Sequence, residues 1–177
     1  MTHILGISGS LRHSSWNTGL LRAAANVLPA GAALEIFDLA PLPFFNQDLE
    51  ADPPPAVVSL RERIKVADAI LIASPEYNYS YTAALKNALD WASRPYGKSV
   101  LNGKPAAIMG AGGYFGTVRA QLHLRQVTTA LSLRVLSHPE LLIAGMGKFD
   151  AAGDLTDEAT REQLRTLVAA LVDRANQ

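Results

Sequence analysis

The chain contains no cysteine, and this absence excludes several classes of site. Without thiols there can be no disulfide, no thiolate zinc site, no cysteine nucleophile and no cysteine-ligated iron–sulfur cluster. The histidines His13, His123 and His138 show no metal-ligand spacing either, and we expect no metal site. Any redox chemistry must therefore use a bound organic cofactor.

An excess of charge and a long apolar run are also missing. Sixteen Lys and Arg balance sixteen Asp and Glu, so the formal net charge is zero and a broad nucleic-acid or membrane surface is not expected. No apolar run approaches the roughly 20 residues of a membrane span, and the N-terminus lacks a signal-peptide pattern. We therefore expect a cytoplasmic protein with neither nucleic-acid nor membrane partners.

A chain of 177 residues suits about one domain, and we expect residues 1–177 to form a single one. Apolar runs of strand length alternate with segments of helical period, which indicates an α/β fold with a parallel sheet. The predicted strands lie within residues 4–7, 34–37, 69–73, 106–109 and 133–143, and Pro139 interrupts the last. Helical stripes occupy residues 20–28, 57–66, 83–93 and 164–171, with a weaker stripe formed by Val118, Leu122 and Leu131. Thr156 is the predicted N-cap of the last helix.

Right-handed crossovers between five strands favour a flavodoxin-like three-layer sandwich with strand order 2-1-3-4-5. The proline-rich residues 41–55 read as a surface loop. Ligands of such sheets bind at the carboxyl ends of the strands, near the point where strand order reverses. The loops after the first, third and fourth strands are therefore the candidate ligand-binding segments.

The loop after the first strand, residues 8–19, is rich in phosphate-binding groups. Four serines, Thr18, Asn17 and Arg12 precede or open a predicted helix, whose free N–H groups and dipole also favour an anion. The loop matches neither the triphosphate P-loop nor the dinucleotide Gly-x-Gly-x-x-Gly pattern. Gly6-Ile7-Ser8-Gly9-Ser10 also departs from a nucleophile elbow at its fifth position. The competing interpretation is an ordinary helix cap and turn.

The other two loops favour a planar ligand. Residues 74–82 hold three of the five tyrosines in the chain, and residues 110–116 hold four glycines, which allow backbone N–H groups to approach a ring. A tyrosine-rich surface loop and a flexible glycine turn are the alternatives. Together the three loops predict a mononucleotide pocket, which FMN fits: a phosphate at the first loop and a ring between the other two.

Two segments resemble the motifs of the NAD(P)H-dependent FMN reductase family, a flavodoxin-like group that includes quinone, chromate and azo-dye reductases. The first is Leu5-Gly6-Ile7-Ser8-Gly9-Ser10-Leu11-Arg12 followed by Ser15-x-Asn17. The second is Ser74-Pro75-Glu76-Tyr77-Asn78-x-Ser80, with Leu85-Lys86-Asn87-Ala88-Leu89-Asp90-Trp91 in the next helix. The resemblance extends from His3 to about Ala175. After the fourth strand the chain departs from the Ser-Gly-Gly string common in the family and has Gly110-Ala111-Gly112-Gly113.

Carried over residue by residue, the resemblance implies two sets of FMN contacts. The phosphate contacts would be Ser10, Arg12, Ser15, Asn17 and Thr18. The residues at the isoalloxazine ring would be Pro75, Glu76, Tyr77, Asn78, Gly112 and Gly113, with Ser80 supporting the turn.

The resemblance further implies an oxidoreductase in which FMN carries hydride from NADPH or NADH to a small acceptor: a quinone, a flavin, an azo dye or a metal oxyanion such as chromate. No side chain is then required as catalytic acid or base. A homodimer or homotetramer is implied as well, with residues 82–93 and 119–134 as candidate interface segments. The alternatives are a flavodoxin-type electron carrier without nicotinamide turnover, which the neutral charge disfavours, and a nucleotide-binding regulatory module.

Overall fold

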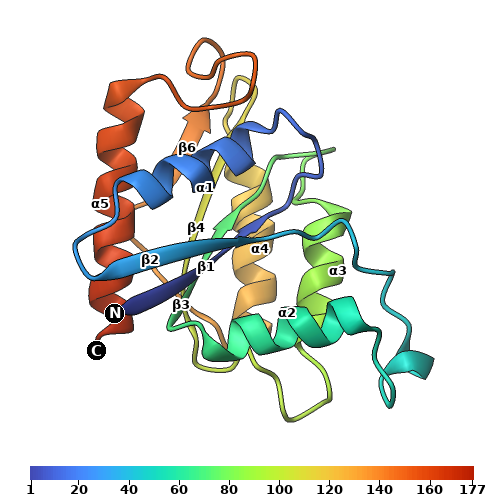
Figure 1. Ribbon diagram of the computed structural model, residues 1–177. Coiled ribbons are helices and arrows are strands. Elements are labelled where there is room, and N and C mark those ends of the chain that lie inside the picture. The colour runs from blue at the N-terminus through green and yellow to red at the C-terminus, as the bar shows by residue number, and fades with distance from the viewer.

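Six parallel strands form one sheet in the computed structural model, which describes residues 1–177 (Figure 1). The strands are β1 (Thr2–Ser8), β2 (Ala32–Phe37), β3 (Ala69–Ala73), β4 (Pro105–Gly112), β5 (Arg134–Val135) and β6 (Leu141–Ala144). Their order is β2-β1-β3-β4-β5, and β6 also pairs with β4. This order confirms the predicted flavodoxin-like sheet.

The outer position of the sheet differs from the prediction of one fifth strand. Residues 134–135 pair with Pro105 and Ala106 at the start of β4, whereas residues 141–144 pair with Met109 to Gly112 at its end. Pro139 stands between the two segments and has no N–H to donate to a strand ladder. The chain therefore lines β4 with two short strands, β5 and β6.

Five α-helices complete the three layers: α1 (Trp16–Asn26), α2 (Pro55–Val66), α3 (Ala83–Ala92), α4 (Val118–Ala130) and α5 (Glu158–Ala175). Alternate residues of the central strands supply the two cores. Leu71 and Met109 pack with α1 and α5, while Ile70, Ile72 and Ile108 pack with α2, α3 and α4. The strands β3 and β4 are covered on both faces, as their unbroken apolar runs predict.

Two predicted details of the helices are wrong. The N-cap of α5 is Asp157, whose carboxylate accepts from the Thr160 N–H, and Thr156 instead donates its hydroxyl to the Lys148 carbonyl. The predicted α4 stripe fails because Leu122 is 57% exposed. The buried face of α4 carries Ala120, Gln121, Leu124 and Thr128, two of them polar, so an apolar pattern could not reveal it.

The proline-rich segment is a loop, as predicted, with one short 3-10 helix, η1 (Gln47–Leu49). It is anchored to α3 by side chains of the second sequence motif. The carbonyl of Pro43 accepts from Asn87 Nδ2 and from Trp91 Nε1, each at 2.9 Å. Phe45 also packs edge-on against Trp91, with ring centroids 4.9 Å apart. Asn87 and Trp91 therefore hold the loop in place.

No helix of the structure is both long enough and apolar enough to cross a bilayer.

Candidate functional site

A cavity of about 160 Å³ lies at the carboxyl ends of β1, β3 and β4, where the strand order reverses. We call it the first cavity. Nine of the twelve residues predicted for the site line it, since its walls are Ser10, Arg12, Ser15, Trp16, Asn17, Pro75, Glu76, Tyr77, Ala111, Gly112 and Gly113. The fold thus brings together three loops that are separated by up to about a hundred positions in the sequence.

The first wall is built for an anion. The backbone N–H groups of residues 13–17, at the start of α1, find no acceptor within the chain. Ser15 is the N-cap of α1, and its hydroxyl accepts from the Thr18 N–H. The Arg12 guanidinium makes no ion pair or hydrogen bond in the structure, although ten ion pairs form between other residues. Free donors, a helix N-terminus and an unpaired cation suit a phosphate.

Two of the predicted phosphate residues have other partners. Asn17 is buried, and its amide bonds both backbone groups of Ala111 in β4, with distances of 2.9 and 3.0 Å. It therefore locks the start of α1 to the end of β4. Thr18 does not line the first cavity, because its Oγ1 lies 2.8 Å from Ser8 Oγ on the other side of the loop.

The second wall contains a tight turn over residues 77–80. Tyr77 and Ser80 exchange two backbone hydrogen bonds of 2.9 and 3.0 Å, and the central residues Asn78 and Tyr79 have φ angles of 49° and 71°. Two positive φ values define a type I′ turn, which favours Asn at the first position and Gly at the second. Tyr79 departs from that preference, so the turn stores backbone strain beside the cavity.

Glu76 and Arg119 connect this turn to α4. The Glu76 carboxylate accepts from the backbone N–H groups of Arg119 and Ala120 and forms an ion pair with the Arg119 guanidinium. It thereby caps α4, whose N-cap Thr117 makes no such bond. The Arg119 guanidinium in turn lies 3.8 Å from the Tyr79 ring centroid.

Glu76 is thus fully engaged, with only 7% of its side chain exposed. Ser80 gives the turn a second link to α4, because its hydroxyl lies 3.1 Å from His123 Nδ1. The third tyrosine of the loop points away from the site. Tyr81 packs against the core under α3, where burial raises the pKa of its phenol despite the opposing charge of Lys86.

The glycines of the third wall serve two purposes. A Cβ on Gly112 would lie 2.2 Å from the Gly116 carbonyl oxygen, so Gly112 is needed to close the turn after β4. A Cβ on Gly113 would meet nothing within 4 Å. Only the second of these two positions therefore leaves open space at the cavity.

Sequence reasoning missed Trp16 and Ala111 as cavity residues and Arg119 as the partner of Glu76. Trp16 stacks on Phe149, with centroids 5.4 Å apart, and a Cβ on Gly145 would come within 2.5 Å of its ring. Trp16 is the residue directly after the predicted phosphate contact Ser15, so its position beside the loop of residues 8–19 could have been noticed. No local signal connects Glu76 with Arg119, 43 positions away.

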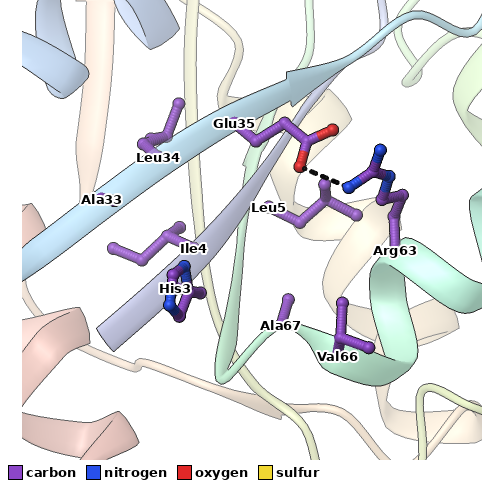
Figure 2. Close-up of a pocket in the computed structure, with 9 residues that line it drawn as sticks. All are labelled: His3, Ile4, Leu5, Ala33, Leu34, Glu35, Arg63, Val66 and Ala67. Carbon is purple, nitrogen blue, oxygen red and sulfur yellow. Dashed lines mark hydrogen bonds and ion pairs between the residues drawn. The ribbon is translucent and has the colours of Figure 1, made fainter. Parts of the chain in front are cut away.

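A hollow of about 320 Å³ lies elsewhere, beneath the carboxyl end of α2 (Figure 2). Its floor is formed by Leu5 and Ala33 of the sheet, and Val66 and Ala67 lie at its wall. Its two opposite charges face each other, since Arg63 Nη1 lies 3.4 Å from Glu35 Oε2. With its two opposite charges paired and its walls mainly apolar, this hollow has no unpaired cation like Arg12 of the first cavity.

Comparisons with known proteins identify the family to which this sequence is similar. Residues 2–148 match the sequence profile of the NADPH-dependent FMN reductase family. The chain is 48% identical over 171 residues to an NAD(P)H-dependent FMN reductase of Pseudomonas aeruginosa, covering 95% of this chain and 92% of that protein. It is 46% identical over 179 residues to an NADPH:quinone oxidoreductase of Arabidopsis thaliana, covering 97% and 90%.

One solved structure is similar to this chain over nearly the whole length of both proteins. The flavoenzyme NAD(P)H:(acceptor) oxidoreductase FerB from Paracoccus denitrificans superimposes with a TM-score of 0.91 at 36% identity, covering 99% of this chain and 98% of that one.

Proposed function

The chain belongs to the NADPH-dependent FMN reductase family, and from that premise we propose that the first cavity is its FMN site and that a quinone is its acceptor. The protein is an NAD(P)H-dependent flavoenzyme oxidoreductase that uses FMN and a small-molecule acceptor. The observation that carries the site assignment is the unpaired Arg12 guanidinium beside five free N–H groups at the start of α1.

The residues present fit FMN. Arg12, Ser10 and Ser15 would hold the phosphate together with the free N–H groups, while Pro75, Tyr77 and Gly113 would border the ring. Asn17 and Ser80 would act indirectly on the flavin: Asn17 fixes the start of α1, and Ser80 fixes the 77–80 turn. Gly112 shapes the third wall, and Asn78 and Thr18 remain proposed contacts.

FMN, when bound, takes hydride from NAD(P)H and passes two electrons to the acceptor. The protein contributes position and exclusion of water. Glu76 is the only carboxylate at the first cavity, and its oxygens are taken by Arg119 and the start of α4. We therefore propose that Glu76 holds the loop of residues 74–82 in place and takes no part in proton transfer.

A quinone suits the rim of the site. Tyr77 lines the first cavity and is 50% exposed, and its flat aromatic face can pack against a flat conjugated acceptor. The flavodoxin-type carrier is disfavoured because the 46–48% identical relatives are reductases and the net charge is zero.

We also propose that residues 1–177 act as one domain in a cytoplasmic homodimer or homotetramer. The apolar stripe of α3 is buried within its own chain, so α3 offers little interface. Exposed apolar surface is supplied instead by Leu122 on α4, by Phe115 just before that helix and by Tyr79, whose ring contacts Arg119 of α4. A cytoplasmic enzyme has direct access to NAD(P)H. Sedimentation of the wild type and of Leu122→Lys tests this interface, and an unchanged mass for the variant would contradict it.

The test of the proposed function is the anaerobic absorption spectrum of the FMN-loaded protein. We expect the yellow flavin band to bleach on addition of NADPH or NADH and to return with one equivalent of a soluble benzoquinone. A band that persists with both nucleotides would remove the reductase assignment. Bleaching without recovery in quinone would leave the reductase and remove this acceptor.

A further inference from the structure

A second cavity of about 310 Å³ lies on the opposite side of the phosphate loop from the first. It opens between residues 8–13 and residues 36–40, at the carboxyl ends of the adjacent strands β1 and β2. Its size falls at the lower end of the range for small-molecule sites. Of the residues that line this cavity and not the first, only Thr18 is a proposed FMN contact.

The two cavities meet at the proposed phosphate site. Ser10 and Arg12 line both of them. A phosphate held there by the Arg12 guanidinium would therefore face the ring cavity on one side and the second cavity on the other. A ligand that continues beyond this phosphate, through a phosphoanhydride, would extend directly into the second cavity.

The far wall carries a group suited to a ribose. Asp38 directly follows β2, and its Oδ1 accepts from the Ala40 N–H at 2.9 Å while Oδ2 has no partner in the chain. A carboxylate at the end of the second strand is the group that dinucleotide-binding α/β folds use to accept hydrogen bonds from the adenosine ribose. The same carboxylate repels a 2′-phosphate.

The remaining walls are largely apolar. Leu11, which is 58% exposed, lies on one side, and Phe37 and Leu39 lie on the other. Such walls can bury the faces of a purine, while the imidazole of His13 adds a hydrogen-bonding group next to the Arg12 guanidinium.

We propose that the second cavity is a subsite for the adenylate half of FAD, so that this protein binds FAD as well as FMN. The inference rests on the proposed FMN site, because the shared phosphate position joins the two cavities. The adenosine ribose of FAD carries no 2′-phosphate and is compatible with Asp38. The NADPH ribose does carry one, which makes NADPH the less suitable occupant.

The test compares dissociation constants of FMN and FAD for the flavin-free protein, measured by isothermal titration calorimetry. We expect FAD to bind the wild type at least as tightly as FMN. Asp38→Ala should weaken FAD about 10- to 150-fold, as expected for lost hydrogen bonds to a charged group, and leave FMN within twofold. Ala40→Trp, which fills the second cavity from an exposed position, should weaken FAD selectively too. Asp48→Asn in η1 is the matched control and should change neither.

Four outcomes would overturn the inference. FAD binding 100-fold weaker than FMN would show that the anhydride cannot pass between the cavities, and the FMN site would stand. Equal FAD affinity in the wild type, Asp38→Ala and Ala40→Trp would place the adenylate outside the second cavity. A higher KM for NADPH in Asp38→Ala with unchanged FAD affinity would assign the cavity to the nicotinamide nucleotide. Failure of both flavins to bind would remove the proposed function as well.

Discussion

At the scale of the residue, the site depends on which polar groups are left without partners. Arg12 is free, whereas Glu76, Asn17 and Ser80 are engaged within the protein. Groups that are already paired gain little from a ligand, since a new contact must replace an existing hydrogen bond. The residues proposed to hold the flavin and the residues that hold the loops are therefore different residues of the same motifs.

Arg12→Ala should weaken FMN binding by about 1.5–3 kcal/mol, because charge-assisted bonds to the phosphate are lost. Arg12→Lys should retain part of the affinity, since a lysine keeps the charge without the bidentate geometry. The control is Arg134→Ala, an exposed unpaired arginine on β5 at the other end of the sheet. Titration of flavin fluorescence measures all three, and equal affinity for Arg12→Ala and the wild type would remove Arg12 from the site.

At the scale of the element, the 77–80 turn and α4 stabilise each other. The turn contains Tyr79 at a φ of 71°, a conformation that costs an L-residue roughly 1–2 kcal/mol. The guanidinium of Arg119 lies over the Tyr79 ring, and Glu76 holds that guanidinium at the start of α4. The strained turn is thus retained through contacts with a neighbouring helix.

This arrangement predicts coupling between Tyr79 and Arg119. In an Arg119→Ala background, Tyr79→Gly should raise the free energy of unfolding by about 1 kcal/mol, because glycine accepts positive φ. With Arg119 present the gain should be smaller by about 0.5–2 kcal/mol, the value of the lost cation–π contact. Urea denaturation of the four proteins gives the coupling energy. Asn78→Gly serves as a control with the same effect in both backgrounds, and additivity of Tyr79 and Arg119 would refute the coupling.

The cap of α5 predicts a specific acid sensitivity. The side-chain and backbone hydrogen bonds of Thr160, helped by Lys148, lower the pKa of Asp157 below its ordinary 3.8. Its contribution to stability is therefore present above about pH 3.8 and is lost as the pH falls through the folded-state pKa. Asp157→Asn should lie below the wild type at neutral pH and converge with it in acid. Denaturation curves between pH 2 and 7 test this, and a constant gap would exclude the carboxylate as the cause.

Some features of the fold and the site can be predicted from a single sequence, and others cannot. The central strands were predictable because doubly covered strands are continuously apolar, as residues 69–73 are. The three site loops were predictable because parallel strands place their carboxyl ends at one edge. The α4 face was not, since Gln121 and Thr128 are buried by tertiary contacts. The link from Glu76 to Arg119 was also hidden, because a single sequence carries no signal for pairing across two elements.

At the scale of the whole molecule, distant segments support the loop of residues 8–19, the proposed phosphate site. After β6, Gly145 packs against Trp16, and the backbone of Gly153 meets α1 at Gly19. The Gly153 oxygen would lie 1.8 Å from a Cβ at Gly19. The segment from β6 to α5 therefore supports the start of α1 from behind, and the geometry of its free N–H groups depends on that support.

Gly19→Ala should consequently lower both stability and FMN affinity. The new methyl group meets backbone and not a flexible side chain, so we expect a loss of about 1–3 kcal/mol or more in the free energy of unfolding. The control is Gly113→Ala, where a Cβ meets nothing within 4 Å and which should leave the free energy of unfolding nearly unchanged. Urea denaturation and flavin titration report the two effects, and a fully stable Gly19→Ala would show that α1 and the 153 segment are free to move apart.

The two chain ends lie side by side, joined by a hydrogen bond of 3.2 Å from Thr2 Oγ1 to Asn176 Oδ1 (Figure 1). Thr2 begins β1, whereas the proposed flavin site follows its last residue, Ser8. A tag or tether at either end is therefore attached to the edge of the sheet opposite the flavin site. Fixed to an electrode through one terminus, the protein would turn its electron-exchanging face toward the solution, where soluble acceptors could reach it.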